Sequence, residues 1–171
     1  MTIPIQFREP RLEDGAKVYA LIRACPPLDV NSAYAYFLLS DHFRHTTVVA
    51  ESEGKLVGCI TAYLRQDQPD VLFVWQVAVH ADARGQGLAK RMLNEVANRP
   101  AAAKAKWMET TISPSNAPSR RLFASWAESR KIGIEEKTYL EPEHFAPAGD
   151  DAAHEAECLF RMGPLPGQTS A

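Results

Sequence analysis

The sequence lacks any apolar run of about 18 residues, the length that a helix needs to cross a membrane. Its first residues also lack the basic start and the long apolar stretch of a secretory signal peptide. Cysteine is scarce: Cys25, Cys59 and Cys158 are odd in number and widely spaced, which argues against a disulfide framework or a metal site. We therefore expect reduced thiols, a cytoplasmic location, no membrane association and no bound metal.

An overall excess of charge is also missing, because the formal net charge is only -2 and no Lys/Arg-rich run occurs. This balance argues against a nucleic-acid partner. The charges are nevertheless unevenly spread: residues 84–131 contain ten Lys or Arg against three Asp or Glu, and the remainder contains nine against eighteen. The distribution fits an anionic ligand on one side and a cationic one on the other, although two solvated faces would produce the same pattern.

The length of 171 residues, with 46% apolar residues, favours one domain with its own core. We expect this domain to span residues 1–163, with 164–171 as a loose tail. Apolar spacing and turn residues predict an α/β fold around one sheet. The predicted strands cover residues 3–8, 46–51, 56–64, 71–79, 107–112, 132–140 and 156–162. One predicted helix ends near residue 25, a second begins near residue 32, and two more cover residues 87–99 and 116–130.

The most informative local pattern is the run Arg84-Gly85-Gln86-Gly87-Leu88-Ala89, which follows a strand and opens a helix. Glycines allow a tight turn and a close approach of ligand to backbone, and free amides at a helix start favour an anion. The run lacks the Gly-Lys-Ser/Thr of a Walker loop and the third glycine of a dinucleotide fingerprint. The remaining alternatives are a phosphate-binding loop and a plain glycine-rich turn.

With the preceding strand Trp75-Gln76-Val77-Ala78-Val79, this run closely resembles the signature of the GNAT acetyltransferase superfamily. Asn116, followed by a helix with Leu122-Phe123, matches a second landmark of that family. The resemblance implies a GNAT fold, with a mixed and mostly antiparallel central sheet flanked by helices. It also implies acetyl-CoA as the co-substrate and an acetyltransferase activity.

The resemblance assigns cofactor roles to particular residues. Backbone amides of Arg84, Gly85, Gln86, Gly87, Leu88 and Ala89 would hold the pyrophosphate. The strand at Gln76, Val77, Ala78 and Val79 would pair with the pantetheine arm, an amide near Val77 would polarise the thioester carbonyl, and Asn116 would contact the arm. One position departs from the family: Phe123 stands where many members have a tyrosine that protonates the leaving thiolate.

Longer segments resemble one branch of the superfamily, the L-2,4-diaminobutyrate acetyltransferases of ectoine biosynthesis. They are residues 26–34 (PPLDVNSAY), 73–79 (FVWQVAV), 110–116 (TTISPSN) and 154–161 (HEAECLFR). This likeness implies a small diamino acid as acceptor and a homodimer. An alternative acceptor is another small amine, such as a polyamine or an aminoglycoside. A further alternative is a sensor that binds acetyl-CoA without catalysis.

A protonated amine, with a pKa of about 10, must be bound as a cation and then lose a proton before it can attack a thioester. The branch resemblance implies an acceptor site formed by Asp29, Asn31, Tyr34, Trp75, Thr111, His154 and Glu157. Of these, we expect Glu157 with His154 to remove the proton, and Asp29 to orient the substrate with Trp75. For each there is a simpler interpretation: Asp29 as a helix cap, Glu157 and His154 as surface groups, and Tyr34 and Trp75 as core residues.

Overall fold

A computed structural model of the chain describes residues 4–146 and 154–167. Seven strands form one sheet in the order β1-β2-β3-β4-β5-β7-β6. The strands are β1 Gln6–Arg8, β2 Val48–Ser52, β3 Lys55–Leu64, β4 Val71–Val79, β5 Trp107–Ile112, β6 Gly133–Leu140 and β7 Glu157–Gly163. The helices are α1 Gly15–Arg23, α2 Ala33–Asp41, α3 Leu88–Ala97 and α4 Ala117–Arg130, with short 3-10 turns at Leu12–Asp14, Ala81–Ala83, Pro100–Ala102 and Pro142–His144.

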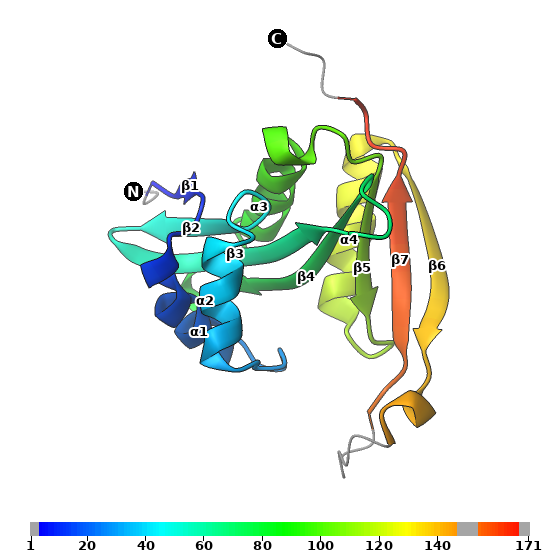
Figure 1. Cartoon of the computed structure of the whole chain (residues 1–171), viewed down its shortest axis with the longest axis horizontal. Coiled ribbons are helices and arrows are strands. Elements are labelled where there is room, and N and C mark those ends of the chain that lie inside the picture. Colours follow the sequence, from blue (N-terminus) through cyan, green and yellow to red (C-terminus); the bar gives the residue numbers. More distant parts are fainter. Residues whose placement is uncertain (1–3, 147–153, 168–171) are drawn as a thin grey trace.

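The helices lie on the two faces of the sheet. Figure 1 shows α1 and α2 in front of β2, β3 and β4, and α3 and α4 behind the sheet. The front of β5, β7 and β6 carries no helix among the described residues (Figure 1). None of the helices in the described part of the chain is long and apolar enough to cross a membrane.

The predicted order of strands and helices is confirmed, and local capping explains why it could be read from the sequence. The Ser32 hydroxyl accepts a hydrogen bond from the Ala35 amide at the start of α2, and the Asn116 carboxamide accepts one from the Ser119 amide at the start of α4. Glu53 and Gly54 both have positive φ in the β2–β3 turn, as a tight hairpin requires. Ile3, the predicted start of the first strand, lies outside the described residues.

Strands β4 and β5 pair for only a short stretch and then separate. Every strand pair is antiparallel except β4 with β5, which is parallel and ends at the pair Phe73–Glu109. Figure 1 shows β4 turning away from β5 beyond this point. The Glu109 carboxylate, 1% exposed, accepts hydrogen bonds from Arg65 at 2.8 Å and from Arg161 at 2.9 Å beside this junction. The sheet therefore opens in its middle, between β4 and β5.

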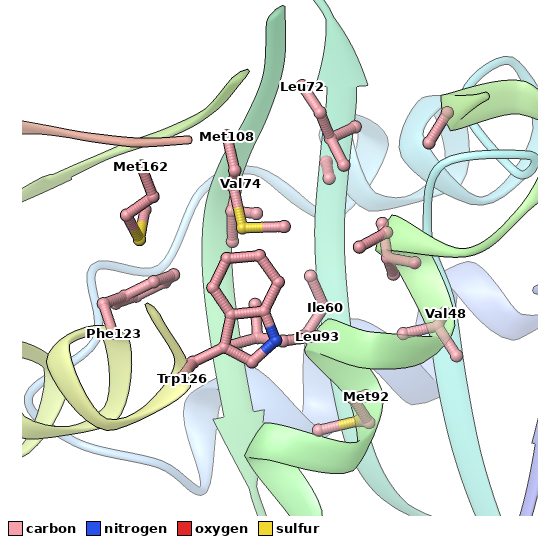
Figure 2. Close-up of a cluster of buried hydrophobic side chains, with 14 of the residues drawn as sticks. Val48, Ile60, Leu72, Val74, Met92, Leu93, Met108, Phe123, Trp126 and Met162 are labelled. Carbon is pink, nitrogen blue, oxygen red and sulfur yellow. The ribbon is translucent and has the colours of Figure 1, made fainter. Parts of the chain in front are cut away.

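The larger apolar cluster packs α3 and α4 against the back of the sheet and closes this region from behind. Figure 2 shows Trp126 of α4 in the centre of the cluster, beside Phe123 and Leu93. The Trp126 indole is fully buried and donates a hydrogen bond to the Asn94 side chain of α3 at 2.9 Å. A smaller cluster joins α1 and α2 to the front of β2, β3 and β4.

The C-terminal segment stays attached to the domain beyond the boundary that we expected at residue 163. The Leu165 amide donates to the Lys106 carbonyl oxygen at 2.7 Å, and the Leu165 side chain packs against the larger cluster. Leu165, which we expected to lie in the tail, is therefore part of the packed structure. Residues 168–171 lie outside the described part of the chain.

We expect Trp126→Ala to lower the free energy of unfolding by about 3 to 5 kcal/mol, since a large buried ring is replaced by a cavity. Urea unfolding followed by circular dichroism would measure this loss. Leu12→Ala is the control: Leu12 is more than half exposed, so its truncation should cost less than about 0.5 kcal/mol. Equal losses in the two variants would show that α4 is not held by this core.

Candidate acetyl-transfer site

The glycine-rich loop adopts the geometry of an anion-binding turn. Gly85 and Gly87 have φ of 75° and 66°, a region that favours glycine, and α3 begins directly after them at Leu88. Amides in the first turn of α3 have no partner within the helix and concentrate positive potential there. The predicted phosphate loop thus lies at a helix N-terminus, where an anion is stabilised.

A cleft of about 720 Å³ lies against this loop. It is lined by the segment 25–28, by the end of β4, by the loop and the start of α3, and by residues of α4. Its charged lining residues are Arg84, Lys90 and Arg121, with no acidic residue among them. Lys90 also donates to the Ser125 hydroxyl at 3.2 Å, which draws its ammonium group toward α4. The cleft is therefore suited to a phosphate-bearing ligand.

The open edge of β4 faces this cleft. The Gln76 amide donates to Thr61 and the His80 amide to Val57, so both point toward β3. Successive backbone groups of a strand point to opposite sides, so the amides of Val77 and Val79 point the other way, into the gap left by β5. In agreement, the Val79 carbonyl accepts from the Arg84 guanidinium at 3.2 Å and from the Cys25 thiol at 3.4 Å. Val77, Ala78 and Val79 line the cleft.

Asn116 reaches the opposite wall of the cleft. Its side-chain oxygen caps α4, and its NH₂ group can donate to an acceptor in the cleft. Arg84, Gly85, Gly87, Leu88 and Ala89 also line the cleft, whereas Gln86 and Gln76 are not among the lining residues. The structure thus gathers most of the predicted cofactor residues around one space.

A second group of predicted residues gathers around Glu157, the first residue of β7. Partial burial raises the pKa of Glu157; the Thr111 hydroxyl and His154 lower it, and the negative charges of Asp29 and Glu155 raise it further. Asp29, Thr111 and His154 therefore lie within interaction range of Glu157, although they come from separate parts of the chain. A half-buried carboxylate with a raised pKa can accept a proton.

His154 and Glu155 have fixed partners beside Glu157. The His154 ring stacks on Phe145 with centroids 3.7 Å apart, and its Nδ1 lies 3.0 Å from the Glu155 carbonyl oxygen. The Glu155 carboxylate accepts a hydrogen bond from the Ser115 hydroxyl at 2.6 Å, which lowers the pKa of Glu155. Glu155 therefore remains ionised and adds negative charge to this site.

Trp75 and Tyr34 are not core residues, which excludes the simpler interpretation of both. The Trp75 side chain is 43% exposed, and Trp75 is the extra residue of a β-bulge where Thr61 pairs with Gln76 and Ala62 with Val74. Tyr34 on α2 is 70% exposed. Asn31 lies in the loop before α2, where its backbone and side chain approach the Tyr36 hydroxyl.

Comparison with known proteins identifies the family. The acetyltransferase (GNAT) family profile matches residues 16–127. The chain belongs to the GNAT family of acetyltransferases.

Relatives of this GNAT protein agree with the branch expected from the longer segments. It is 46% identical to the L-2,4-diaminobutyric acid acetyltransferase of Bordetella parapertussis, over 93% of this chain and 84% of that protein. It is 41% identical to the enzyme of the same name from Halomonas elongata, over 95% and 82%. The diaminobutyrate acetyltransferase EctA of Paenibacillus lautus, solved with L-2,4-diaminobutyric acid and coenzyme A, superimposes with a TM-score of 0.91 at 42% identity, covering 98% of this chain and 99% of that one.

Two residues of this GNAT site have environments that sequence reasoning missed. Tyr36 is fully buried and donates to Gln76 at 3.1 Å, and Gln76 donates to the Asp29 carbonyl oxygen at 2.7 Å. The family resemblance places Gln76 with the cofactor residues, yet its side chain holds the loop that carries Asp29. Spacing could not reveal this contact, because it joins residues 47 positions apart.

Phe123 belongs to the core cluster of this GNAT fold and is almost fully buried between α4 and the sheet (Figure 2). A phenyl ring has no proton to give, so Phe123 does not protonate a leaving thiolate. The described residues also contain no group of three side chains arranged to hold a metal ion.

We expect Gly87→Ala to weaken the binding of coenzyme A by about tenfold, since the added Cβ projects from a backbone that a phosphate must approach closely. Gly54→Ala is a matched control: both glycines have positive φ, and a Cβ added at either would meet no other atom within 4 Å, but Gly54 lies in the remote β2–β3 turn. Each variant should lose about 1 kcal/mol of stability. Calorimetric titration with coenzyme A would separate them, and equal affinities would contradict a role for this loop.

Proposed function

We propose that this protein transfers the acetyl group of acetyl-CoA to the γ-amine of L-2,4-diaminobutyrate, the acetylation step of ectoine biosynthesis. The observation that carries the proposal is that the Asp29 carboxylate lies within electrostatic range of Glu157, while residues 25–28, directly before Asp29, line the cleft. The acceptor has two ammonium groups, so each carboxylate can face one of them. The relatives of the same name and the structural match with EctA support this choice of acceptor.

The cleft fits acetyl-CoA as the acetyl donor. Three cationic side chains and the N-terminus of α3 suit its phosphates, and the unpaired β4 edge suits the amide groups of its arm. Acetyl-CoA supplies an activated thioester. The Val77 amide, which points into the gap, would donate a hydrogen bond to the oxygen that becomes negative when an amine attacks. Asn116 would contact the arm through its NH₂ group.

The carboxylates of Asp29 and Glu157 would bind the acceptor as a cation, and Glu157 would then deprotonate it. Asp29 and Trp75 would orient the acceptor, with the Trp75 ring as one wall for an ammonium group. Asn31, Tyr34 and Thr111 would complete the pocket around it. Glu157, with His154 beside it, would take the proton from the γ-amine. Because burial and neighbouring carboxylates raise the pKa of Glu157, this group is a stronger base than an ordinary glutamate.

Three further properties stay predictions. A homodimer is expected from the family, and the exposed aromatic residues Phe43 and Tyr139 offer apolar surface for such contacts. A cytoplasmic location is expected from the cysteine usage. A single domain, which we expect to span residues 1–163, is supported by the continuous sheet and by a core that Leu165 also contacts.

Release of free thiol from acetyl-CoA should occur with L-2,4-diaminobutyrate, and NMR of the product should show the acetyl group on the γ-nitrogen. Ornithine, lysine and spermidine should react at least about tenfold more slowly, because they are longer and a misplaced amine loses its alignment with the thioester. Faster turnover of spermidine or an aminoglycoside would reassign the acceptor. Binding of acetyl-CoA without turnover of any amine would instead indicate a sensor.

Glu157→Gln should lower kcat by about 100-fold or more, as expected when a general base is lost. For the unsubstituted protein, kcat/KM should rise with pH through the pKa of Glu157 and level off, with the midpoint above the ordinary value of a glutamate. In the variant, this rise of kcat/KM through the pKa of Glu157 should disappear. The rate should instead follow the small fraction of unprotonated amine and increase with pH up to about pH 10.

Glu135→Gln is the control for this measurement, since Glu135 is an exposed carboxylate on β6. It should leave both kcat and the pH profile unchanged. An unchanged acid limb in Glu157→Gln would assign the base to another group.

A further inference from the structure

A chain of hydrogen bonds fastens the Asp29 loop to strand β4. The Gln76 Nε2 donates to the Asp29 carbonyl oxygen at 2.7 Å, and the Tyr36 hydroxyl donates to the Gln76 Oε1 at 3.1 Å. The Asn31 amide in turn donates to the Tyr36 hydroxyl at 3.2 Å. Two backbone groups of the loop, at Asp29 and at Asn31, are therefore held by side chains that come from β4 and α2.

The chemistry of these groups leaves this chain of bonds a single arrangement. A carbonyl oxygen only accepts, so the Gln76 NH₂ must face Asp29 and the Gln76 oxygen must face Tyr36. The Tyr36 hydroxyl then has its proton committed and can only accept from Asn31. Tyr36 is fully buried and Gln76 is 6% exposed, so water cannot readily replace either partner.

The position of Gln76 on β4 connects this loop to the place of acetyl transfer. Gln76 lies between Trp75, the bulge residue, and Val77, whose amide points into the gap. Its own amide is held by the Thr61 hydroxyl at 3.1 Å across the bulge. Residues 25–28, directly before Asp29, line the cofactor cleft. One rigid point of the sheet thus fixes both the open edge and the acceptor loop.

We infer that Gln76 and Tyr36 are positioning residues. They fix the distance between Asp29 and the open edge of β4, and thereby decide which nitrogen of the acceptor is acetylated. The inference rests on the proposed function. The α- and γ-amines of the acceptor are separated by only a few bonds, so a shift of about 1 Å in the anchor changes which of them is aligned with the thioester. Neither Gln76 nor Tyr36 lines the cleft, so both would act through the loop that they hold.

Gln76→Leu and Tyr36→Phe remove the hydrogen bonds while keeping similar side-chain volume. Each should raise the KM for diaminobutyrate by about tenfold, the effect of losing a well-made buried hydrogen bond. The kcat should change by less than about threefold, and the affinity for coenzyme A should stay unchanged, because Glu157 and the phosphate loop are intact. NMR of the product should show the α-acetyl isomer, which the unsubstituted protein should not form.

Thr46→Val is the matched control for stability. The Thr46 hydroxyl donates to the Ala62 carbonyl oxygen at 2.7 Å and is similarly buried, but Thr46 does not line the cleft and, within the described chain, its hydroxyl bonds only to Phe43 and Ala62. It should lower the melting temperature as much as Tyr36→Phe while KM and product stay unchanged. If Tyr36→Phe and Gln76→Leu also keep both KM and product, their role is structural only and the inference is overturned.

A double substitution tests whether Gln76 acts through Asp29. In an Asp29→Asn background, Gln76→Leu should raise KM by no more than about twofold, since coupled residues give non-additive effects. A full additional tenfold increase would overturn the inference.

The unsubstituted protein tests the proposed function independently of the inference about Gln76 and Tyr36, through the amine that it acetylates. If it prefers another amine, the same variants should raise the KM for that amine. If it turns over no amine, hydrogen exchange still decides: the amides of residues 28–32 should exchange faster in Gln76→Leu and Tyr36→Phe than in Thr46→Val. Unchanged exchange would overturn the inference in that case too.

Discussion

The separation of β4 from β5 is the constraint on which the site depends. A strand in the middle of a sheet normally has both edges paired, and buried amides and carbonyls without partners cost free energy. Beyond the pair Phe73–Glu109, one edge of β4 has no partner strand among the described residues. The backbone groups on this edge therefore have no partner strand within the described chain, and the last carbonyl, that of Val79, accepts hydrogen bonds from the Arg84 and Cys25 side chains.

The rest of the fold supports this opening from both sides. The cluster around Trp126 and Phe123 ties α3 and α4 to the back of the sheet, so the phosphate loop at the start of α3 stays fixed relative to β4. Arg65 and Arg161 donate hydrogen bonds to the Glu109 carboxylate and balance its buried charge at the junction. On the front, Tyr36 and Gln76 tie the acceptor loop to the same strand. The glycine-rich loop and the Asp29 loop are therefore both held against β4.

Charge separates the two halves of the site. The charged side chains that line the cleft are all cationic, whereas Asp29 and Glu155 add negative charge around Glu157. The same division exists along the sequence, where residues 84–131 are basic and the remainder is acidic. Opposite potentials on the two sides favour a phosphate-bearing donor on one and a cationic amine on the other. Burial raises the pKa of Glu157, and the neighbouring carboxylates Asp29 and Glu155 raise it further.

The sequence by itself determined the order of the elements and the glycine-rich turn before α3, because these depend on neighbouring positions. Ser32 and Asn116 cap helices locally, and Gly85 and Gly87 permit a turn that other residues resist. The acceptor residues could be named only through family resemblance. The tertiary structure alone decided that Gln76 faces the Asp29 loop, that Trp75 occupies a bulge and that the pKa of Glu157 is raised. Such features arise between distant segments, and no local pattern encodes which buried donor meets which acceptor.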